Sequence, residues 1–257
     1  MPQNLFDLTD KVALITGGSR GLGREMALAF ADHGSHVAIA SRKLEQCEKV
    51  AREVESRGVQ AFAYACHVAK WPELEALVDA TYARFGRIDI LVNNAGLSPL
   101  YPALDEISEE LFDKVIGINL KGPFRLSALI AKRMAAGDGG SIINVSSTAA
   151  VTPSPMSEPY GAAKAGLNAL TRSLAHAYAP KVRVNCLMPG PFLTDISKAW
   201  DMEAFEAGAK ARIPLQRGGQ PHEIVGAALY LASNASSYTT GAIIAIDGGS
   251  QGNPKIL

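Results

Sequence analysis

A tyrosine and a lysine four residues apart form the pattern with the clearest chemical meaning. Tyr160 and Lys164 are separated by three small residues inside a segment with a helical pattern. Four residues along a helix return to the same face, so the phenol and the ammonium point the same way. Because a nearby cation stabilises a phenolate, such a tyrosine could exchange protons with a substrate at a working pH, although Tyr-Lys pairs also occur on ordinary surface helices.

Other polar residues stand where they could act with this pair. Ser147 follows an apolar run and lies 13 residues before Tyr160. Asn94, within the run Asn93–Gly96, follows a second apolar run, and Asn119 lies within a long helical segment, where a polar side chain needs a reason. All except Asn119 fall at the ends of expected strands or just beyond them.

A glycine-rich turn joins the first apolar run to a helical segment. Gly17, Gly21 and Gly23 have the spacing G-x-x-x-G-x-G, and Ser19, Arg20 and Leu22 fill the positions between them. Glycines let the backbone turn sharply and approach a phosphate, and the helix start offers free N–H groups and a positive dipole end. With a strand before and a helix after, the turn predicts a dinucleotide site. A tight turn with no ligand is the alternative.

The end of the second apolar run indicates which dinucleotide is bound. NAD-binding folds often place a carboxylate there for the ribose diol, but this chain has Ser41, Arg42 and Lys43. Arg42 can bind a 2′-phosphate through two parallel charged hydrogen bonds, with Arg20 on the other side. We therefore expect NADP(H) and keep NAD(H) as the less favoured alternative. Arg42 could also be a solvated residue at a helix start.

These residues need a scaffold, and the hydrophobic pattern provides one. Of the 257 residues, 47% are hydrophobic. Short, nearly continuous apolar runs are typical of parallel strands covered on both faces. The expected strands are Val12–Thr16, Val37–Ala40, Ala61–Cys66, Ile88–Val92, Ser141–Val145, Arg183–Leu187 and Ile243–Ile246. The expected helices are Gly21–Asp32, Leu44–Ser56, Pro72–Phe85, Glu109–Ala136, Pro159–Tyr178 and Pro221–Ser233.

This alternation predicts a single α/β domain over residues 1–257. Its sheet is expected to be doubly wound (Rossmann), seven-stranded and mostly parallel, with helices on both faces. Ligands of such sheets lie beyond the carboxyl ends of the strands, where the polar residues above are found.

Composition argues against several other classes of protein. Lys plus Arg and Asp plus Glu number 25 each, which gives no broad basic face for nucleic acid. Three cysteines without a C-x-x-C pair and five histidines without metal spacing predict no metal site. No signal segment and no apolar run of about 20 residues is found, so we expect no membrane association and a cytoplasmic location.

Taken together, the motifs resemble the short-chain dehydrogenase/reductase family over nearly the whole chain, and are similar to its 3-oxoacyl-[acyl-carrier-protein] reductase-like members. The resemblance implies a catalytic tetrad of Asn119, Ser147, Tyr160 and Lys164. Tyr160 would protonate a carbonyl oxygen that Ser147 holds by a hydrogen bond. Lys164 would lower the pKa of Tyr160 and bind the nicotinamide ribose, and Asn119 would anchor a water that returns a proton to Lys164.

The resemblance also implies cofactor contacts along the sheet edge. Besides Tyr160 and Lys164, they would come from the residues Asn94, Ala95, Gly96, Pro189, Gly190 and Thr194, with Thr194 holding the nicotinamide carboxamide. His67 and Val68 stand where the family usually has an aspartate beside the adenine. His67 could donate or accept in the plane of the base, or point away.

The substrate and the assembly are less closely defined. An apolar segment at 191–214 would be a mobile lid, with walls from 97–104 and 151–157. A carbonyl or alcohol is expected: a 3-oxoacyl thioester, a sugar-derived ketone or a cyclic ketone. Apolar residues on more than one face of the long helices favour a homotetramer, then a dimer. The alternatives are an NAD-dependent alcohol dehydrogenase, a non-catalytic NADP(H)-sensing binding protein and a methyltransferase.

Overall fold

The protein is built around one sheet of seven parallel strands, which confirms the expected fold class. A computed structural model describes residues 4–152, 155–195, 197 and 200–252. The strands run in the order β3-β2-β1-β4-β5-β6-β7, and every pair of neighbours is parallel. They are β1 (Val12–Thr16), β2 (His36–Ser41), β3 (Ala61–Ala65), β4 (Ile90–Asn93), β5 (Gly140–Val145), β6 (Val182–Pro189) and β7 (Ile243–Ile246).

The strand order reverses beside β1. From β1 the chain winds outward to β2 and β3, then returns to β4 on the other side of β1. Thr16 at the end of β1 is therefore paired with Asn93 at the end of β4. The connections leaving the two strands diverge at this point, which is where doubly wound sheets bind ligands.

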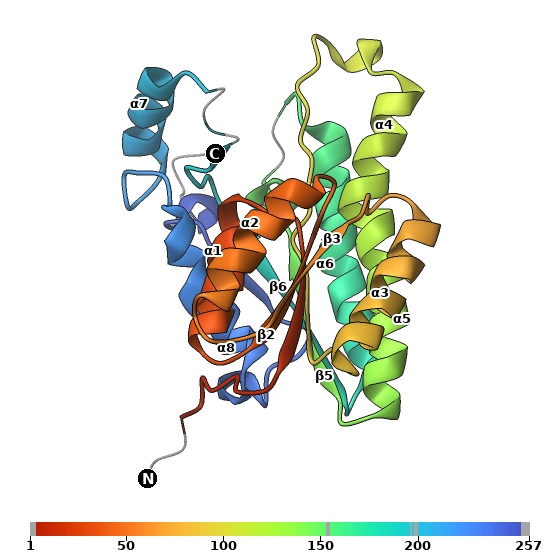
Figure 1. Cartoon of the computed structure of the whole chain (residues 1–257). Coiled ribbons are helices and arrows are strands. Elements are labelled where there is room, and N and C mark those ends of the chain that lie inside the picture. Colours follow the sequence, from red (N-terminus) through yellow and green to blue (C-terminus); the bar gives the residue numbers. More distant parts are fainter. Residues whose placement is uncertain (1–3, 153–154, 196, 198–199, 253–257) are drawn as a thin grey trace.

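Helices cover both faces of the sheet (Figure 1). One layer contains α1 (Gly21–Asp32), α2 (Leu44–Glu55) and α8 (Val225–Ala232). The other contains α3 (Trp71–Phe85), α5 (Gly122–Ala136) and α6 (Glu158–Tyr178), with α4 (Glu109–Ile116) packed on α6. The helix α7 (Met202–Arg212) extends beyond the carboxyl ends of the strands.

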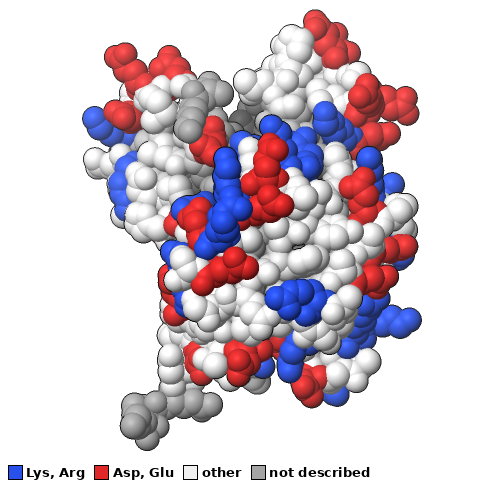
Figure 2. All heavy atoms as spheres, viewed as in Figure 1, with Lys and Arg blue, Asp and Glu red and all other residues white. Residues whose placement is uncertain are grey.

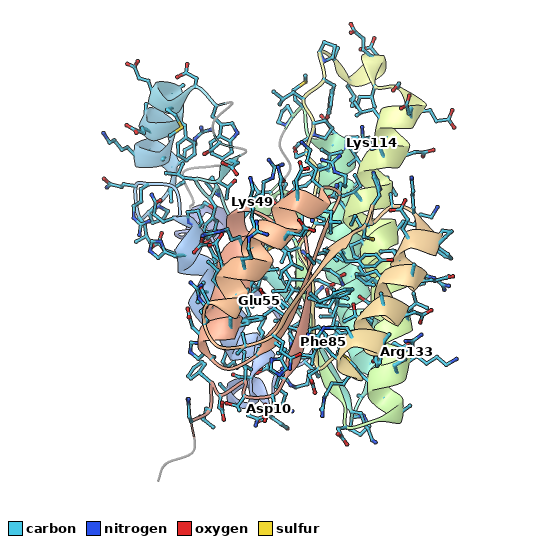
Figure 3. All side chains as sticks on the ribbon, viewed as in Figure 1. Asp10, Lys49, Glu55, Phe85, Lys114 and Arg133 are labelled. Atoms are coloured by element: carbon cyan, nitrogen blue, oxygen red, sulfur yellow. The ribbon has the colours of Figure 1, made fainter. Side chains whose placement is uncertain are left out.

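Two apolar clusters fill the space between the sheet and its helix layers. Side chains pack densely on both sides of the strands (Figure 3). Ile15 and Phe30 belong to one cluster, Leu14 and Ile130 to the other, and all four are fully buried. Because successive strand residues point to opposite faces, a strand covered on both sides is apolar throughout, as all five residues of β1 are buried.

The expected helix 109–136 is divided in the structure. α4 ends at Ile116, residues Gly117–Lys121 form a π-helical turn, and α5 begins at Gly122. In the wide turn the N–H of Gly122 bonds to the carbonyl of Gly117, five residues earlier. Pro123 explains the change, because it has no N–H to donate to the carbonyl of Asn119. The expectation of one continuous helix was therefore wrong, and Asn119 lies in the wide turn.

Other boundaries differ by a few residues. β4 begins at Ile90 rather than Ile88, β6 continues to Pro189, and the expected helix 221–233 starts as a 3₁₀ turn over Pro221–Ile224. Acidic and basic side chains are mixed over the face seen in Figure 2. Within the described part of the chain, no helix has both the length and the apolar character needed to span a bilayer.

Candidate active site

The glycine-rich turn lies between β1 and α1, as expected. Gly17 has a φ of +64°, in the left-handed region that only glycine adopts without strain. At Gly23 a Cβ atom would lie 2.4 Å from the carbonyl oxygen of Gly17 and 2.5 Å from Nδ2 of Asn94. The two glycines therefore serve different needs: Gly17 makes the turn, and Gly23 lets α1 pack against it.

Asn94 holds this turn from the neighbouring strand. Its Nδ2 donates to the carbonyl oxygens of Thr16 and Gly17, both at 3.1 Å. In return, the hydroxyl of Thr16 accepts from the N–H groups of Asn94 and Ala95 at 3.1 and 3.2 Å. Four hydrogen bonds thus join the carboxyl ends of the neighbouring strands β1 and β4. The sequence placed Thr16 at the end of the first strand but predicted no role for its hydroxyl, although a hydroxyl in an apolar strand was a usable signal.

The start of α1 fits a bound pyrophosphate. Arg20 occupies the N-cap position in an extended conformation and makes no capping bond with its side chain, and no acidic residue lies in the first turn. The first N–H groups of a helix require acceptors, which a phosphate supplies. The helix start without a side-chain cap or a carboxylate in its first turn therefore suits the pyrophosphate of a dinucleotide.

Arg20 lies in the glycine-rich turn just before α1, and Arg42 follows the last residue of β2. Both side chains are exposed, and among the described residues neither makes an ion pair. By contrast, Arg24 is bound by Glu25 and Glu53. Ser41 contacts the thiol of Cys47 through its hydroxyl at 3.0 Å. Two cations remain available for an anion at this corner.

His67 and Val68 follow β3 near the same edge. Nδ1 of His67 accepts from the N–H of Ala69 at 3.3 Å, which leaves Nε2 to carry the proton of the neutral ring. Its own N–H donates to Glu73 at 2.7 Å. Val68 lines a small hollow with Ala95 and Ile118. His67 could contact the adenine or point away. Its Nδ1 is bound within its own loop, so a contact with the adenine would come from Nε2 as a donor.

Ser147, Tyr160 and Lys164 come together beyond the end of β5. Ser147 accepts from the N–H of Ala149 at 3.2 Å through its Oγ, so its own proton is available. That proton serves a hydrogen bond between Ser147 and Tyr160. Lys164 is 3% exposed, its Nζ donates to the carbonyl oxygen of Val145 at 2.8 Å, and it lies 5.6 Å from the centre of the Tyr160 ring.

Asn119 is brought to Lys164 by the π-helical turn. It is fully buried, and its Nδ2 donates to the carbonyl oxygens of Leu97 and Val115 at 2.7 and 2.9 Å. Its Oδ1 accepts from the N–H of Leu97 at 3.2 Å. A Cβ on Gly96 would lie 3.2 Å from this oxygen and 3.7 Å from Nζ of Lys164. The glycine therefore separates the two side chains and keeps the space beside them open.

The proton affinities of the pair differ from the sequence expectation. Burial raises the pKa of Tyr160, and the hydrogen bond with Ser147 offsets this only in part. Burial also lowers the pKa of Lys164 to about 8. In the chain alone Tyr160 is thus a protonated phenol, suited to giving a proton, and Lys164 titrates close to the working pH.

Lys164 should leave a signature in the pH dependence of stability. Its pKa falls from 10.5 in the unfolded chain to about 8 in the folded chain, so between these values the unfolded chain binds more protons. The free energy of unfolding should then rise with pH by up to about 3 kcal/mol relative to Lys164→Met. Urea titrations from pH 7 to 10.5 measure this difference.

The comparison with the variant is necessary because other groups act in the opposite direction. Burial raises the pKa of the Cys66 and Cys186 thiols to about 12 and about 11, which makes stability fall as pH rises above 9. The Cys66 contribution is shared by both proteins and cancels in the difference, whereas Cys186 interacts with Lys164, so the clearest part of the difference lies below pH 9. A Lys114→Met variant, changed at an exposed lysine of α4, is the control. If the wild type and Lys164→Met show parallel pH profiles, the ammonium is not desolvated.

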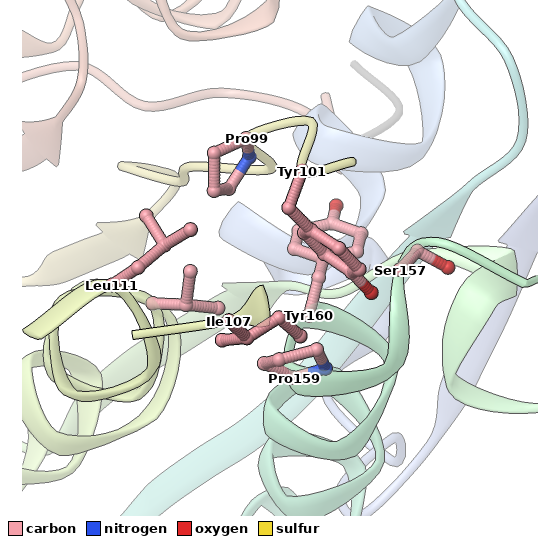
Figure 4. A pocket seen from close by; sticks show the side chains of 8 residues that line it. Pro99, Tyr101, Ile107, Leu111, Ser157, Pro159 and Tyr160 are labelled. Atoms are coloured by element: carbon pink, nitrogen blue, oxygen red, sulfur yellow. The ribbon is translucent and has the colours of Figure 1, made fainter. Parts of the chain in front are cut away.

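A small hollow, open to solvent, adjoins Tyr160. Its lining is mainly apolar, and Figure 4 shows Tyr101, Ser157 and Tyr160 across from Ile107 and Leu111. The full lining is Pro99, Tyr101, Ile107, Leu111, Val115, Ser157, Pro159 and Tyr160. Residues 97–104 and 151–157 were expected to form walls. Both ranges contribute, although positions 153 and 154 of the second lie outside the described residues.

Tyr101 and Glu158 form a contact that was not anticipated. The hydroxyl of Tyr101 donates to the Glu158 carboxylate and accepts from the N–H of Glu158 at 3.0 Å. The bond joins the loop after β4 to the start of α6, 57 residues later in the chain. Nothing in the local pattern could indicate this pair, because it depends on where two loops meet.

The segment after β6 reaches the glycine turn. A Cβ on Gly21 would lie 3.6 Å from the side chain of Thr194, so the two meet at the cofactor edge. Pro189 ends β6, and the N–H of Gly190 donates to the carbonyl oxygen of Ile246 in β7.

In the expected lid at 191–214, α7 is a mainly exposed helix, and Trp200 packs on Phe205 with ring centres 5.0 Å apart. Positions 196, 198 and 199 lie outside the described residues.

Comparisons with known proteins agree with this arrangement. Residues 17–251 match the family model described as "Enoyl-(Acyl carrier protein) reductase". The chain is 36% identical to "Dehydrogenase/reductase SDR family member 4" of Pongo abelii over 244 residues, which cover 94% of this chain and 88% of that protein.

Solved structures share the whole fold. A gluconate 5-dehydrogenase from Burkholderia cenocepacia J2315, in complex with NADP and tartrate, has a TM-score of 0.92 and 35% identity, covering 97% of this chain and 98% of that one. A 7α-hydroxysteroid dehydrogenase complexed with NADH and 7-oxoglycochenodeoxycholic acid has a TM-score of 0.91 and 34% identity, with 96% of both chains covered. An oxidoreductase scaffold therefore underlies the site, and the chain belongs to the short-chain dehydrogenase/reductase family.

Proposed function

We propose that the protein transfers a hydride between NADP(H) and a carbonyl or alcohol substrate, with Tyr160 as the general acid and base. The observation that carries this proposal is the cluster formed by Tyr160, Ser147 and the buried Lys164 beside the pocket. A buried lysine is costly, so a fold that keeps one next to a phenol uses it.

Each residue has a distinct part in the reaction. When bound, the nicotinamide dinucleotide supplies or accepts the hydride. In the reductive direction Tyr160 gives its proton to the carbonyl oxygen, while the Ser147 hydroxyl stabilises the charge that develops there. Lys164, with a pKa of about 8, can pass a proton toward Tyr160. Asn119 holds the backbone of Leu97, which keeps the space beside Lys164 open for water.

The preference for NADP(H) rests on Arg20 and Arg42. Two exposed guanidinium groups without a carboxylate partner in the described chain favour a dianionic 2′-phosphate over a ribose diol. An NAD-dependent alcohol dehydrogenase of the same family remains the second candidate, because the related structures include both an NADP and an NADH complex.

Arg42→Ala should separate these candidates. We expect the variant to bind NADPH about tenfold to a hundredfold more weakly and NADH nearly unchanged, because one charged bidentate contact is lost. Thermal shifts with each dinucleotide measure this, since a ligand that binds the native state raises the melting temperature. Arg52→Ala, at an exposed arginine near the other end of α2, is the control. Equal shifts by both dinucleotides in the wild type would overturn the NADP assignment.

We further propose that residues 191–214 close over an uncharged carbonyl or alcohol. The apolar pocket lining and the packed Trp200–Phe205 pair support this.

A homotetramer is supported by exposed Phe112 and Phe124 on the outer surfaces of α4 and α5. The three free, buried cysteines support a reducing compartment such as the cytoplasm.

A further inference from the structure

The contact between Tyr101 and Glu158 fixes a carboxylate at the edge of the pocket. The hydroxyl of Tyr101 donates to one carboxylate oxygen and accepts from the N–H of Glu158 at 3.0 Å. The other oxygen accepts from the N–H of Met156 at 3.3 Å. Both oxygens are engaged, so the charge cannot swing freely away.

The carboxylate is also kept ionised. The hydrogen bond from Tyr101, followed by backbone N–H groups at the start of α6, holds the pKa of Glu158 below its usual value. The Tyr101 hydroxyl donates its only proton in the hydrogen bond to Glu158, so it cannot also donate a hydrogen bond to a substrate. None of the eight described lining residues is a lysine, arginine or histidine. The negative charge therefore has no cationic counterpart in the pocket wall.

Glu158 lies close to the chemistry in the chain as well as in space. It is the first residue of α6, two positions before Tyr160, and its partner Tyr101 lines the same hollow as Tyr160. Figure 4 shows Tyr101 and Tyr160 on the same side of this hollow. A substrate that fills this hollow while its carbonyl reaches Tyr160 places its neighbouring groups beside Tyr101, whose hydroxyl binds Glu158.

We propose that Glu158 is a specificity-determining residue, whose fixed charge excludes substrates with a carboxylate near the reacting carbonyl and leaves the pocket to neutral ones. This inference rests on the proposed function. Two like charges at the mouth of the hollow repel even though water partly screens the exposed Glu158 carboxylate, and discrimination by repulsion needs no contact with the favoured substrate.

The test compares matched acids and esters with NADPH as the reductant. A panel of ketones such as 4-oxopentanoate and its methyl ester keeps the carbonyl chemistry nearly constant while changing the charge. In the wild type we expect kcat/KM for the ester to exceed that for the acid by about fivefold, as expected for a charge in contact with water. Glu158→Gln, which removes the charge with little change of shape, should bring the ratio close to one.

Two further measurements distinguish charge from shape. Tyr101→Phe breaks one of the bonds that hold the carboxylate but keeps its charge and its bond to the N–H of Met156, so the ester-to-acid ratio should lie between those of the wild type and Glu158→Gln. Raising the ionic strength from 0.02 to 0.5 M should shrink the ratio of the wild type and leave that of Glu158→Gln unchanged, because salt screens only the charged pair.

The outcomes separate this inference from the proposal beneath it. Reduction of acids and esters with equal efficiency by the wild type would leave the proposed function standing and overturn the role of Glu158. An equal loss of the ratio in Tyr101→Phe and Glu158→Gln would assign the effect to loop displacement and overturn it too. If the wild type reduced no neutral ketone of the panel, the proposed function itself would be contradicted.

Discussion

Tyr160→Phe should lower turnover about a thousandfold while the protein still folds and binds the dinucleotide. The variant loses the phenolic proton beside Ser147 and Lys164, and a positioned acid or base contributes roughly 10² to 10⁴ in rate. Because the ring remains, its packing beside Lys164 is kept. Steady-state assays with a ketone and NADPH, together with thermal shifts by NADPH, measure the two effects separately.

Tyr178→Phe is the matched control, since this tyrosine lies at the other end of the same helix and packs in the core. It should keep wild-type turnover. Wild-type activity in Tyr160→Phe would show that another group transfers the proton. Loss of NADPH binding together with activity would instead place Tyr160 in the cofactor site alone.

Gly23→Ala should have the second largest effect, on both stability and cofactor binding. The new methyl group would lie 2.4 Å from the carbonyl oxygen of Gly17 and 2.5 Å from Nδ2 of Asn94. Neither neighbour can yield cheaply, because one is backbone and the other holds the turn by hydrogen bonds. We expect a loss of about 3 kcal/mol in the free energy of unfolding and a large loss of NADPH affinity. Urea unfolding and dinucleotide titration measure these effects.

Gly226→Ala provides the control, because Gly226 is also helical and a Cβ there would meet nothing within 4 Å. Alanine has the higher helix propensity, so this variant should be as stable as the wild type or more so, by up to about 1 kcal/mol. A Gly23→Ala protein as stable as Gly226→Ala would mean that the turn relaxes at little cost.

The sequence was sufficient to predict the seven-stranded sheet, because seven apolar runs with short connections leave few alternative topologies. The glycine turn and the expected strand ends also placed Ser147, Tyr160 and Asn94 on one edge. The interruption at Gly117–Lys121 was missed, although Gly122 and Pro123 inside an apparent helix were a signal against continuity. A period of 3.6 residues continues on both sides of the wide turn and hides it.

Features that depend on tertiary contacts could not be anticipated. The bond between Tyr101 and Glu158 joins two loops whose approach no local rule predicts. The pKa directions of Tyr160 and Lys164 are set by the depth of burial, which a spacing of four residues does not report. Similarly, the hydrogen bond from the N–H of Ala69 to Nδ1 of His67 depends on the conformation of a short loop. In each case the residue type was visible, and its surroundings were not.

The uncapped beginning of α1 has a consequence for the lifetime of the protein. Its first N–H groups have no side-chain acceptor at the N-cap, so a bound dinucleotide would complete the helix as well as serve the reaction. Molecules without cofactor should then open more often at this helix and be cut sooner by proteases. Abundance in the cell would follow the supply of the dinucleotide, with no regulatory partner required.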